Sequence, residues 1–274
     1  MDLNVRTLLA PVLLLLSIGG CAPLPSGEPA APRAEPLRYA GAYAGDLFWE
    51  GRVVMAGDVL ILAGGSLTIR AGTEVLVEPA EGTQIDPDYL SSQTELLVRG
   101  RLDSAGTGSA PVRFLLVDPD VAESYAWAGI TLDRAGDSRI VQTEISRADT
   151  AIRLVASSPL IEGNRIVGNR YGIIVQQQSA PKILGNTLRD GEGGIYCWRG
   201  ASPYLKGNRI SGHDEEAIFV DASSRPWLDR NSVTGNRIGL AIYSRDLPVD
   251  EPSFRDNGED IRWLGRQGLP DRLP

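Results

Sequence analysis

The residues with the greatest chemical potential are acidic side chains in two short stretches one repeat apart. The four candidates for catalysis are Asp190, Glu192, Asp214 and Glu215. Two carboxyl groups about 5–10 Å apart can act as the acid and the base or nucleophile at a glycosidic bond. Carboxylate oxygens can also ligate Ca²⁺. The same residue types are equally typical of solvated turns, because turns meet water.

Aromatic residues offer a second kind of site. If short strands stack in register, alternation turns four rings outward on adjacent coils: Tyr196, Trp198, Phe219 and Tyr243. Polar residues lie around them in the sequence pattern: Gln176, Arg199, Asp221 and Arg245. Flat rings beside polar groups suit a stacked sugar or a protein contact. The alternative is cross-strand stacking that only stabilises a sheet. We expect that simpler role for a smaller outward ladder of Lys182, Tyr204 and Trp227.

Soft-metal and nucleophilic chemistry have few residues to use. The chain has one His, two Cys and two Met, whereas a copper site draws on these types. Cys197 falls at an inward position of the pattern, which predicts a core residue. His213 has Asp214 next to it, and adjacent residues seldom form a catalytic triad. We therefore expect no cofactor, with Ca²⁺ reserved for the case that the acidic turns are enzymatic.

An internal repeat must position all these residues. Proline recurs at steps of 22, 22, 23 and 26 residues, at Pro159, Pro181, Pro203, Pro226 and Pro252. Five residues after each proline stands an asparagine: Asn164, Asn186, Asn208, Asn231 and Asn257. A β-prone segment precedes each proline, at 152–154, 173–175, 195–197, 218–220 and 240–242. Each unit therefore holds three short strands separated by turns.

Such a unit cannot bury its inner face alone, so copies must stack. The pattern predicts an all-β fold, a single-stranded right-handed parallel β-helix with about 22 residues and three short strands per coil, and roughly nine coils. The recurrent asparagine tolerates a left-handed turn, and its amide can bond to the amides above and below.

The earlier half of the chain carries matching pieces, Leu67-Thr-Ile69, Ala71-Gly72-Thr73, Leu97-Val98-Arg99-Gly100 and Trp127-Ala-Gly129-Ile130. Over roughly 47–257 the chain resembles the bacterial right-handed β-helix proteins of the pectin-lyase-like superfamily. That superfamily hosts lyases, hydrolases, epimerases and non-enzymes, so the resemblance implies a fold rather than an activity. The β-helix proteins that assist copper-site maturation of nitrous oxide reductase share this fold and compartment, but the shortage of soft ligands disfavours that reading.

Two features weaken an enzymatic interpretation. The next inward residue follows each repeat asparagine by only nine or ten positions, as Ile173 follows Asn164, so no long loops form the walls of a groove. The paired-Asp and Arg-x-Lys motifs of polygalacturonase-like hydrolases are also absent from the sequence. We therefore expect a non-enzymatic binding or scaffold module for an envelope glycan or a protein partner. The alternative is a polysaccharide lyase, hydrolase or epimerase that uses the acidic turns.

The N-terminal segment has the features of a targeting signal. Residues 8–18 form an apolar run too short to span a bilayer but suited to a signal peptide. Ile18-Gly-Gly-Cys21 resembles the lipobox of bacterial lipoproteins, which implies a diacylated Cys21, and Ala22 implies the outer membrane. An ordinary secretory peptide is the alternative. We expect a signal peptide over 1–20, a Pro-rich tether over 21–38, and the β-helix over 39–274. The chain would then face the periplasm or the exterior, held to the membrane by its lipid.

Composition limits the remaining classes. The chain has 35 acidic and 27 basic residues and a net charge of −8, which argues against nucleic-acid binding. A hydrophobic share of 42% excludes a mainly disordered chain.

The two ends of the β-helix need covers, and we expect end caps at 39–50 and 261–264. The segments 79–94 and 118–126 are predicted to be loops that leave the coil, and a purely structural role of the aromatic face would follow if they shielded it.

Overall fold

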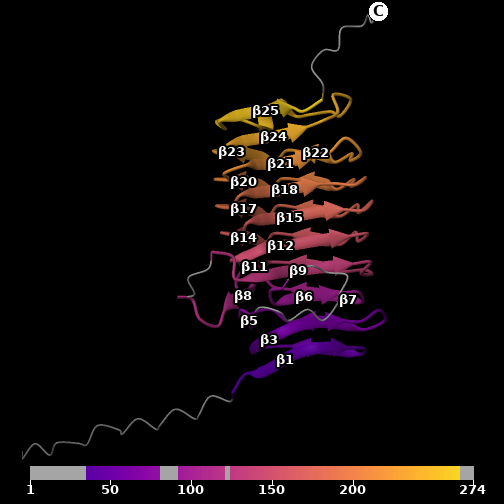
Figure 1. Ribbon diagram of the computed structural model, residues 1–274, viewed down its shortest axis with the longest axis vertical. Helices are drawn as coiled ribbons and strands as arrows, with labels where there is room; N and C mark the ends of the chain where they lie inside the picture. Colours follow the sequence, from indigo (N-terminus) through magenta and orange to yellow (C-terminus); the bar gives the residue numbers. More distant parts are fainter. Residues whose placement is uncertain (1–34, 81–91, 121–123, 266–274) are drawn as a thin grey trace, which may run out of the picture. The chain divides into compact units, whose positions relative to one another are not determined.

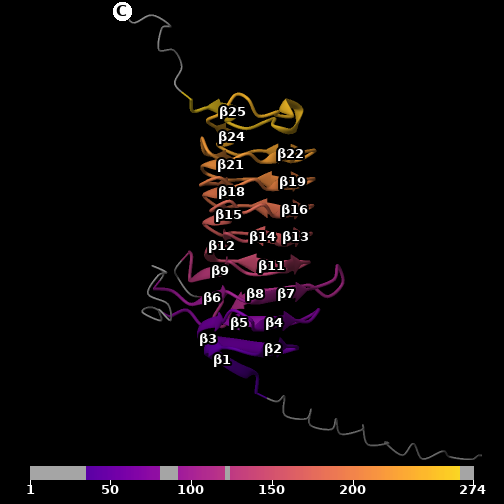
Figure 2. The ribbon, with the colours of Figure 1, turned by 90° about the vertical axis from the view of Figure 1, so that its right-hand side faces the viewer.

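The computed structural model describes residues 35–80, 92–120 and 124–265, except the side chain of Pro252. From Pro36 onward these residues belong to one compact unit, a parallel β-solenoid of about nine turns that recur every ~22 residues, with almost no helix (Figures 1 and 2). The predicted β-helix is thus confirmed. Cys21, the segment 1–20 and most of the tether lie outside the described residues.

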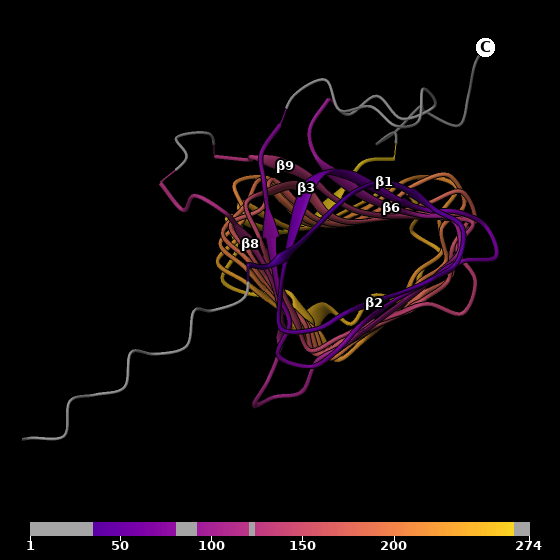
Figure 3. The same cartoon turned by 90° about the horizontal axis from the view of Figure 1, so that it is seen from below.

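The strands form three columns, and every strand pairs in parallel with its neighbours one coil away. The first column contains β1 (Leu37–Tyr43), β3 (Arg52–Ile61), β6 (Glu95–Val98), β9 (Trp127–Asp133), β12 (Ala148–Val155), β15 (Tyr171–Gln176), β18 (Gly193–Cys197), β21 (Glu216–Val220), β24 (Ile238–Ile242) and β25 (Glu259–Trp263). Figure 3, viewed along the stack, shows the coils superimposed around one interior.

The second column is a separate eight-stranded sheet. It contains β2 (Asp46–Trp49), β4 (Ser66–Ile69), β7 (Arg101–Ala105), β10 (Arg139–Val141), β13 (Leu160–Glu162), β16 (Lys182–Leu184), β19 (Tyr204–Lys206) and β22 (Trp227–Asp229). The third contains β5 (Glu74–Val77), β8 (Val112–Leu116), β11 (Thr143–Ser146), β14 (Arg165–Val167), β17 (Thr187–Arg189), β20 (Arg209–Ser211) and β23 (Ser232–Thr234). The first and third columns form one sheet because β3 pairs with both β5 and β6.

Inward side chains of successive coils stack in register to form the core. In the first column one such row is fully buried: Ile152, Ile173, Ile195, Ile218 and Leu240. Cys197 lies in the parallel row between Val175 and Val220 and is also fully buried, as its position predicted. Each fully buried aliphatic side chain contributes about 1.5–3 kcal/mol relative to exposure, which explains why short strands suffice here.

The repeat asparagines form a buried ladder at the turn between the second and third columns. The backbone N–H and Nδ2 of Asn186 both donate to Oδ1 of Asn208 at 3.0 Å, and Asn164 donates to Asn186 in the same way. Asn208 continues the pattern to Asn231. Each Nδ2 also donates to a strand carbonyl below, such as that of Ile161. We call this series the first ladder.

A second ladder lies five residues further along each coil, and the sequence pattern did not reveal it. Asn169 occupies it low in the stack, and Asn236 and Asn257 occupy it near the end. The N–H and Nδ2 of Asn236 donate to Oδ1 of Asn257 at 3.0 and 2.9 Å. Asn257 therefore stacks on Asn236 and not on Asn231, which corrects its assignment to the fifth repeat.

The last repeat departs from the others because its turn is longer. The second column ends at β22, and the 3₁₀ helix η1 (Glu251–Ser253) takes the place of a further strand. Phe254 consequently bridges to Val233 of the third column instead of extending the second. The predicted terminal cap forms β25, which pairs with β24 and carries the first column one coil further.

The predicted N-terminal cap forms the first coil. β1 begins at Leu37 and pairs with β3, while β2 pairs with β4. Tyr39 packs against the buried Trp49 with ring centroids 5.2 Å apart, which closes that end of the core. In the described ranges no helix has the length and apolar character needed to cross a membrane.

Candidate functional site

Five rings form a continuous aromatic strip on the outer face of the first column: Tyr171, Tyr196, Trp198, Phe219 and Tyr243. Strand register creates it, because Tyr196 of β18 lies directly below Phe219 of β21. These two rings stack with centroids 5.4 Å apart and planes 18° apart. Trp198 meets both of them edge-on, at 5.8 and 6.1 Å. Strands about 4.8 Å apart bring large outward rings into such contact.

The strip has a buried part and an accessible part. Tyr196 is only 5% exposed, whereas Trp198 is 36% and Tyr243 43% exposed. The Tyr196 hydroxyl donates to Glu216 Oε2 at 2.9 Å. Burial, followed by the Glu216 carboxylate, raises the pKa of Tyr196 and keeps the phenol protonated. Tyr196 therefore supports the exposed rings and offers little surface to a ligand.

A shallow hollow of about 480 Å³ lies over the accessible part. Its lining consists of Trp198, Arg199, Phe219, Asp221, Ala222, Ser223 and Tyr243. The structure thus brings together five of the eight predicted binding residues. Gln176 lies one coil below Trp198 and outside this lining, and Arg245 is turned to the Trp263 ring, 4.8 Å from its centroid. Ala222 and Ser223 belong to a turn whose path strand periodicity does not predict.

Asp221 shapes the wall of the hollow. Its carboxylate accepts the backbone N–H groups of Arg199, Ser223 and Ser224 at 2.8–3.0 Å. Partial burial alone would raise the pKa of Asp221, but these donors, with the side chains of Ser223 and Ser224, lower it below its usual value. The carboxylate is therefore ionised and committed to the turn. The Arg199 side chain is exposed on the rim.

The predicted catalytic carboxylates lie beside the strip but are held apart from the hollow. Arg170 donates to Glu192 at 2.9 Å and pairs with Asp149 at 3.2 Å, and these contacts raise the pKa of its guanidinium. Asp190 pairs with its neighbour Arg189 at 3.4 Å. Asp214 and Glu215 follow in the next coil, with Glu215 N–H bonded to the Glu192 carbonyl. None of these four candidates lines the hollow.

The described parts of the two predicted loops leave the upper strip open. Gln93 donates to the Tyr125 carbonyl at 2.8 Å, which ties the two loops together near the level of β9. The Tyr125 phenol lies near Glu192 and Arg170, at the lower end of the strip. Segments 81–91 and 121–123 lie outside the described residues. The described residues around Trp198 and Tyr243 leave both rings exposed to solvent.

His213 occupies the second ladder, where other coils place asparagine. It is 4% exposed, its N–H donates to Asn236 Oδ1 at 3.1 Å, and Gly191 holds the equivalent position one coil below. The imidazole lies beside the Gly191 and Leu188 carbonyls, yet neither ring nitrogen makes a well-formed hydrogen bond with the described residues. Burial lowers the pKa of His213, so the ring is neutral near pH 7.

One family model matches the chain, that of the periplasmic copper-binding protein NosD, over residues 116–262. The match covers more than half of the chain and coincides with the regular coils. The chain belongs to this NosD family. Neither the curated proteins nor the solved structures contain a significant match.

Family membership corrects two expectations. The shortage of soft ligands in the sequence argued against a relationship to the β-helix proteins linked to copper, and the family match shows that this expectation was wrong. The expectation of no cofactor, with Ca²⁺ only for an enzyme, is contradicted by a family described as copper-binding. The membership supports the predicted β-helix and places the family in the periplasm.

The donor set of the solenoid does not fit a copper centre. Met55 and Cys197 are fully buried in separate rows of the core, and His213 lies within the second ladder. Burial raises the pKa of the Cys197 thiol, which disfavours the thiolate that binds metal. Among the described residues no group of three or more His, Cys, Asp or Glu side chains could hold a metal ion. No step of the function proposed below passes through copper.

Proposed function

We propose that this NosD-family chain is a non-enzymatic binding module of the cell envelope, and that its aromatic strip binds a glycan. The hollow beside Trp198 and Tyr243 carries the proposal. Exposed indole and phenol rings lie on a rigid base of stacked Tyr196 and Phe219. The C–H faces of sugars pack on such flat apolar rings.

The spacing of the two exposed rings supports an oligosaccharide ligand. Trp198 follows β18 and Tyr243 follows β24, two coils further along the stack. At the usual strand spacing the two positions are about 10 Å apart, so a chain of sugars is needed to touch both. The guanidinium of Arg199 at the edge supplies hydrogen-bond donors for sugar hydroxyls.

The polar groups of the hollow support binding over catalysis. Asp221 is the single carboxylate in the lining, and backbone N–H groups occupy it. An acid–base pair needs a second carboxyl group across the scissile bond. Glu192 and Asp149 share Arg170 instead, an arrangement that fixes the turns of adjacent coils.

We further propose that the chain is anchored at the outer membrane through a lipidated Cys21. The apolar run at 8–18 and Ile18-Gly-Gly-Cys21 support this. Metabolic labelling with an alkynyl fatty acid tests it directly. The label should appear on the wild-type chain and be lost in Cys21→Ser, and an unlabelled wild-type chain would contradict the anchor.

The test of glycan binding is an array of bacterial envelope oligosaccharides probed with the full chain and single variants. Trp198→Ala and Tyr243→Ala should each lose the signal, because each removes one of the two exposed rings. Trp227→Ala is the matched control, since Trp227 is 65% exposed on β22 of the second column, away from the strip.

Three results would overturn the proposal. The first is binding that persists in both strip variants. The second is an array without signal while photo-crosslinking from position 198 captures an envelope protein, which would assign the strip to a protein partner. The third is the release of shortened or unsaturated sugars, which would make the chain an enzyme.

A further inference from the structure

The first ladder ends at Asn231 without a described acceptor above it. One coil lower, the N–H and Nδ2 of Asn208 donate to Oδ1 of Asn231 at 3.0 and 2.9 Å. No described residue accepts the backbone N–H of Asn231, and its Nδ2 group uses one hydrogen on the Leu205 carbonyl. The donors at the end of the ladder therefore converge on the point where the next amide oxygen would lie.

The second ladder shows how this chain completes such an end. Asn257 is its last amide, and its N–H and Nδ2 both donate to Oδ1 of Asp260, at 3.0 and 2.9 Å. A carboxylate oxygen thus takes the place of the next amide oxygen. A buried N–H is costly to leave unpaired, and a carboxylate is a stronger acceptor than an amide, so this termination is favourable.

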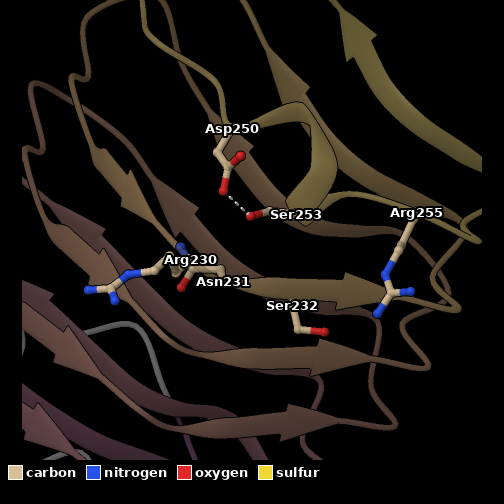
Figure 4. A pocket seen from close by; sticks show the side chains of 6 residues that line it. All are labelled: Arg230, Asn231, Ser232, Asp250, Ser253 and Arg255. Carbon is tan, nitrogen blue, oxygen red and sulfur yellow. Dashed lines mark hydrogen bonds between the residues drawn. The ribbon is translucent and has the colours of Figure 1, made fainter.

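A hollow of about 250 Å³ lies at the open end of the first ladder. Its lining consists of Arg230, Asn231, Ser232, Asp250, Ser253 and Arg255. In Figure 4 the two arginines lie at opposite sides, Asn231 and Ser232 lie between them, and Asp250 and Ser253 lie on the facing segment. The hollow exists because η1 replaces the strand that would otherwise continue the second column.

The charges around this hollow favour an anion on the Arg255 side. Arg230 is already paired with Asp229 at 2.9 Å, and the lowered pKa of Asp229, about 2, keeps that carboxylate ionised. Arg255 is exposed and has no ion-pair partner among the described residues. Asp250 opposes an incoming anion, although its Oδ2 is occupied by the Ser253 hydroxyl at 2.6 Å.

We propose that this ladder-end hollow binds a carboxylate-bearing ligand. One carboxylate oxygen accepts the hydrogen bonds of Asn231, as Asp260 accepts those of Asn257, and the guanidinium of Arg255 pairs with the charge. The carboxylate can belong to a sugar acid or to the end of a peptide. The site lies at the turn between β22 and β23, so it does not depend on the aromatic strip.

The backbone amide resonance of Asn231 in the ¹⁵N-labelled full chain reports the predicted bond directly. Titration with acetate, D-glucuronate or N-acetylalanine should shift this resonance saturably, whereas D-glucose should leave it in place. A response to D-glucuronate but not N-acetylalanine assigns the site to sugar acids, and the reverse assigns it to peptide ends. Both support the proposal.

Variants separate recognition from nonspecific ion effects. Arg255→Gln should weaken carboxylate affinity about tenfold, because one charge-assisted hydrogen bond is lost. Asp250→Asn should strengthen it, because the opposing charge is removed. Arg165→Gln is the matched control, because Arg165 is an exposed arginine on β14, three coils below β23, and its loss should leave the affinity unchanged.

Two outcomes overturn the proposal. One is an Asn231 resonance that no carboxylate moves, or that moves equally in wild type and Arg255→Gln. The other is a response to inorganic phosphate with none to the carboxylates. Both readouts are independent of glycan binding at Trp198, so failure here and failure of the proposed function are distinguishable.

Discussion

The ring of Tyr196 stacks under that of Phe219, with centroids 5.4 Å apart, while its hydroxyl is bonded to Glu216. This pair couples the coil of β18 to the coil of β21 from outside the core, whereas the inward rows couple the same coils from inside. The accessible rings of the strip therefore rest on a base that is itself part of the packing.

The stacked pair predicts unequal effects of two substitutions. Tyr196→Ala should lower the free energy of unfolding by about 3 kcal/mol, because it removes a nearly buried ring. Tyr196→Phe keeps the ring and should cost only about 1 kcal/mol, the value of one hydrogen bond. Urea denaturation followed by circular dichroism measures both. Equal losses would show that the hydroxyl, not the stacking, matters.

The first ladder predicts a large cost for a small side chain. Asn186 is fully buried, accepts two N–H bonds from Asn164 and donates to the Ile161 carbonyl and to Asn208. Asn186→Ala should destabilise the chain by about 3 kcal/mol, because several buried polar groups lose their partners. Glu162→Gln, on the exposed side of β13, is the control and should stay within about 0.5 kcal/mol of wild type.

His213 predicts a specific dependence of stability on pH. The folded state keeps the ring neutral with a pKa below its ordinary value, so the unfolded state binds a proton first as the pH falls. The contribution of His213 is therefore complete above about pH 6.5 and is lost as the pH falls toward the depressed pKa. The His213→Asn variant should lack this loss of stability at acidic pH, because asparagine fits the second ladder without titrating. Parallel unfolding curves at neutral and mildly acidic pH measure the difference, and identical pH profiles would contradict it.

Cys197 should take no part in metal binding by the folded chain. Its thiol is fully buried, and burial raises its pKa, so the thiolate is disfavoured. In a Cys21→Ser background the remaining thiol should react with Ellman's reagent only after denaturation. Cys197→Ala should leave copper affinity, measured by competition with a chromophoric chelator, unchanged within experimental error. A drop in copper affinity would show that the core opens to the metal.

The repeat period was sufficient to predict the β-helix, because Pro, Asn and inward aliphatic residues return in step. The same regularity misplaced Asn257, since the final turn is longer and η1 shifts the chain by several residues. The second ladder was detectable as a position five residues after each repeat asparagine. It was hidden because Gly191 and His213 interrupt the run of amides there.

The candidate site was predictable only in part. Alternation identifies the rings that face outward, but it does not say how much each ring covers the next. Tyr196 consequently proved nearly buried, while Trp198 and Tyr243 stayed accessible. The opening above Asn231 depends on where a column stops, and a pattern of repeats contains no signal for its own end. An association with copper is indicated only by family membership, because the low numbers of His, Cys and Met argue against a copper site.

Parallel pairing between adjacent coils also has an evolutionary consequence. Strand pairing joins each described coil to the coils above and below, so duplication or deletion of one unit of about 22 residues below β12 leaves the strand pairing of the strip and of the upper ends of both ladders intact. Such a change would lengthen or shorten the stack by one strand spacing, about 4.8 Å. The distance between the N-terminal end of the stack and the binding surface can therefore change in steps of one coil during evolution, while the residues that recognise the ligand stay the same.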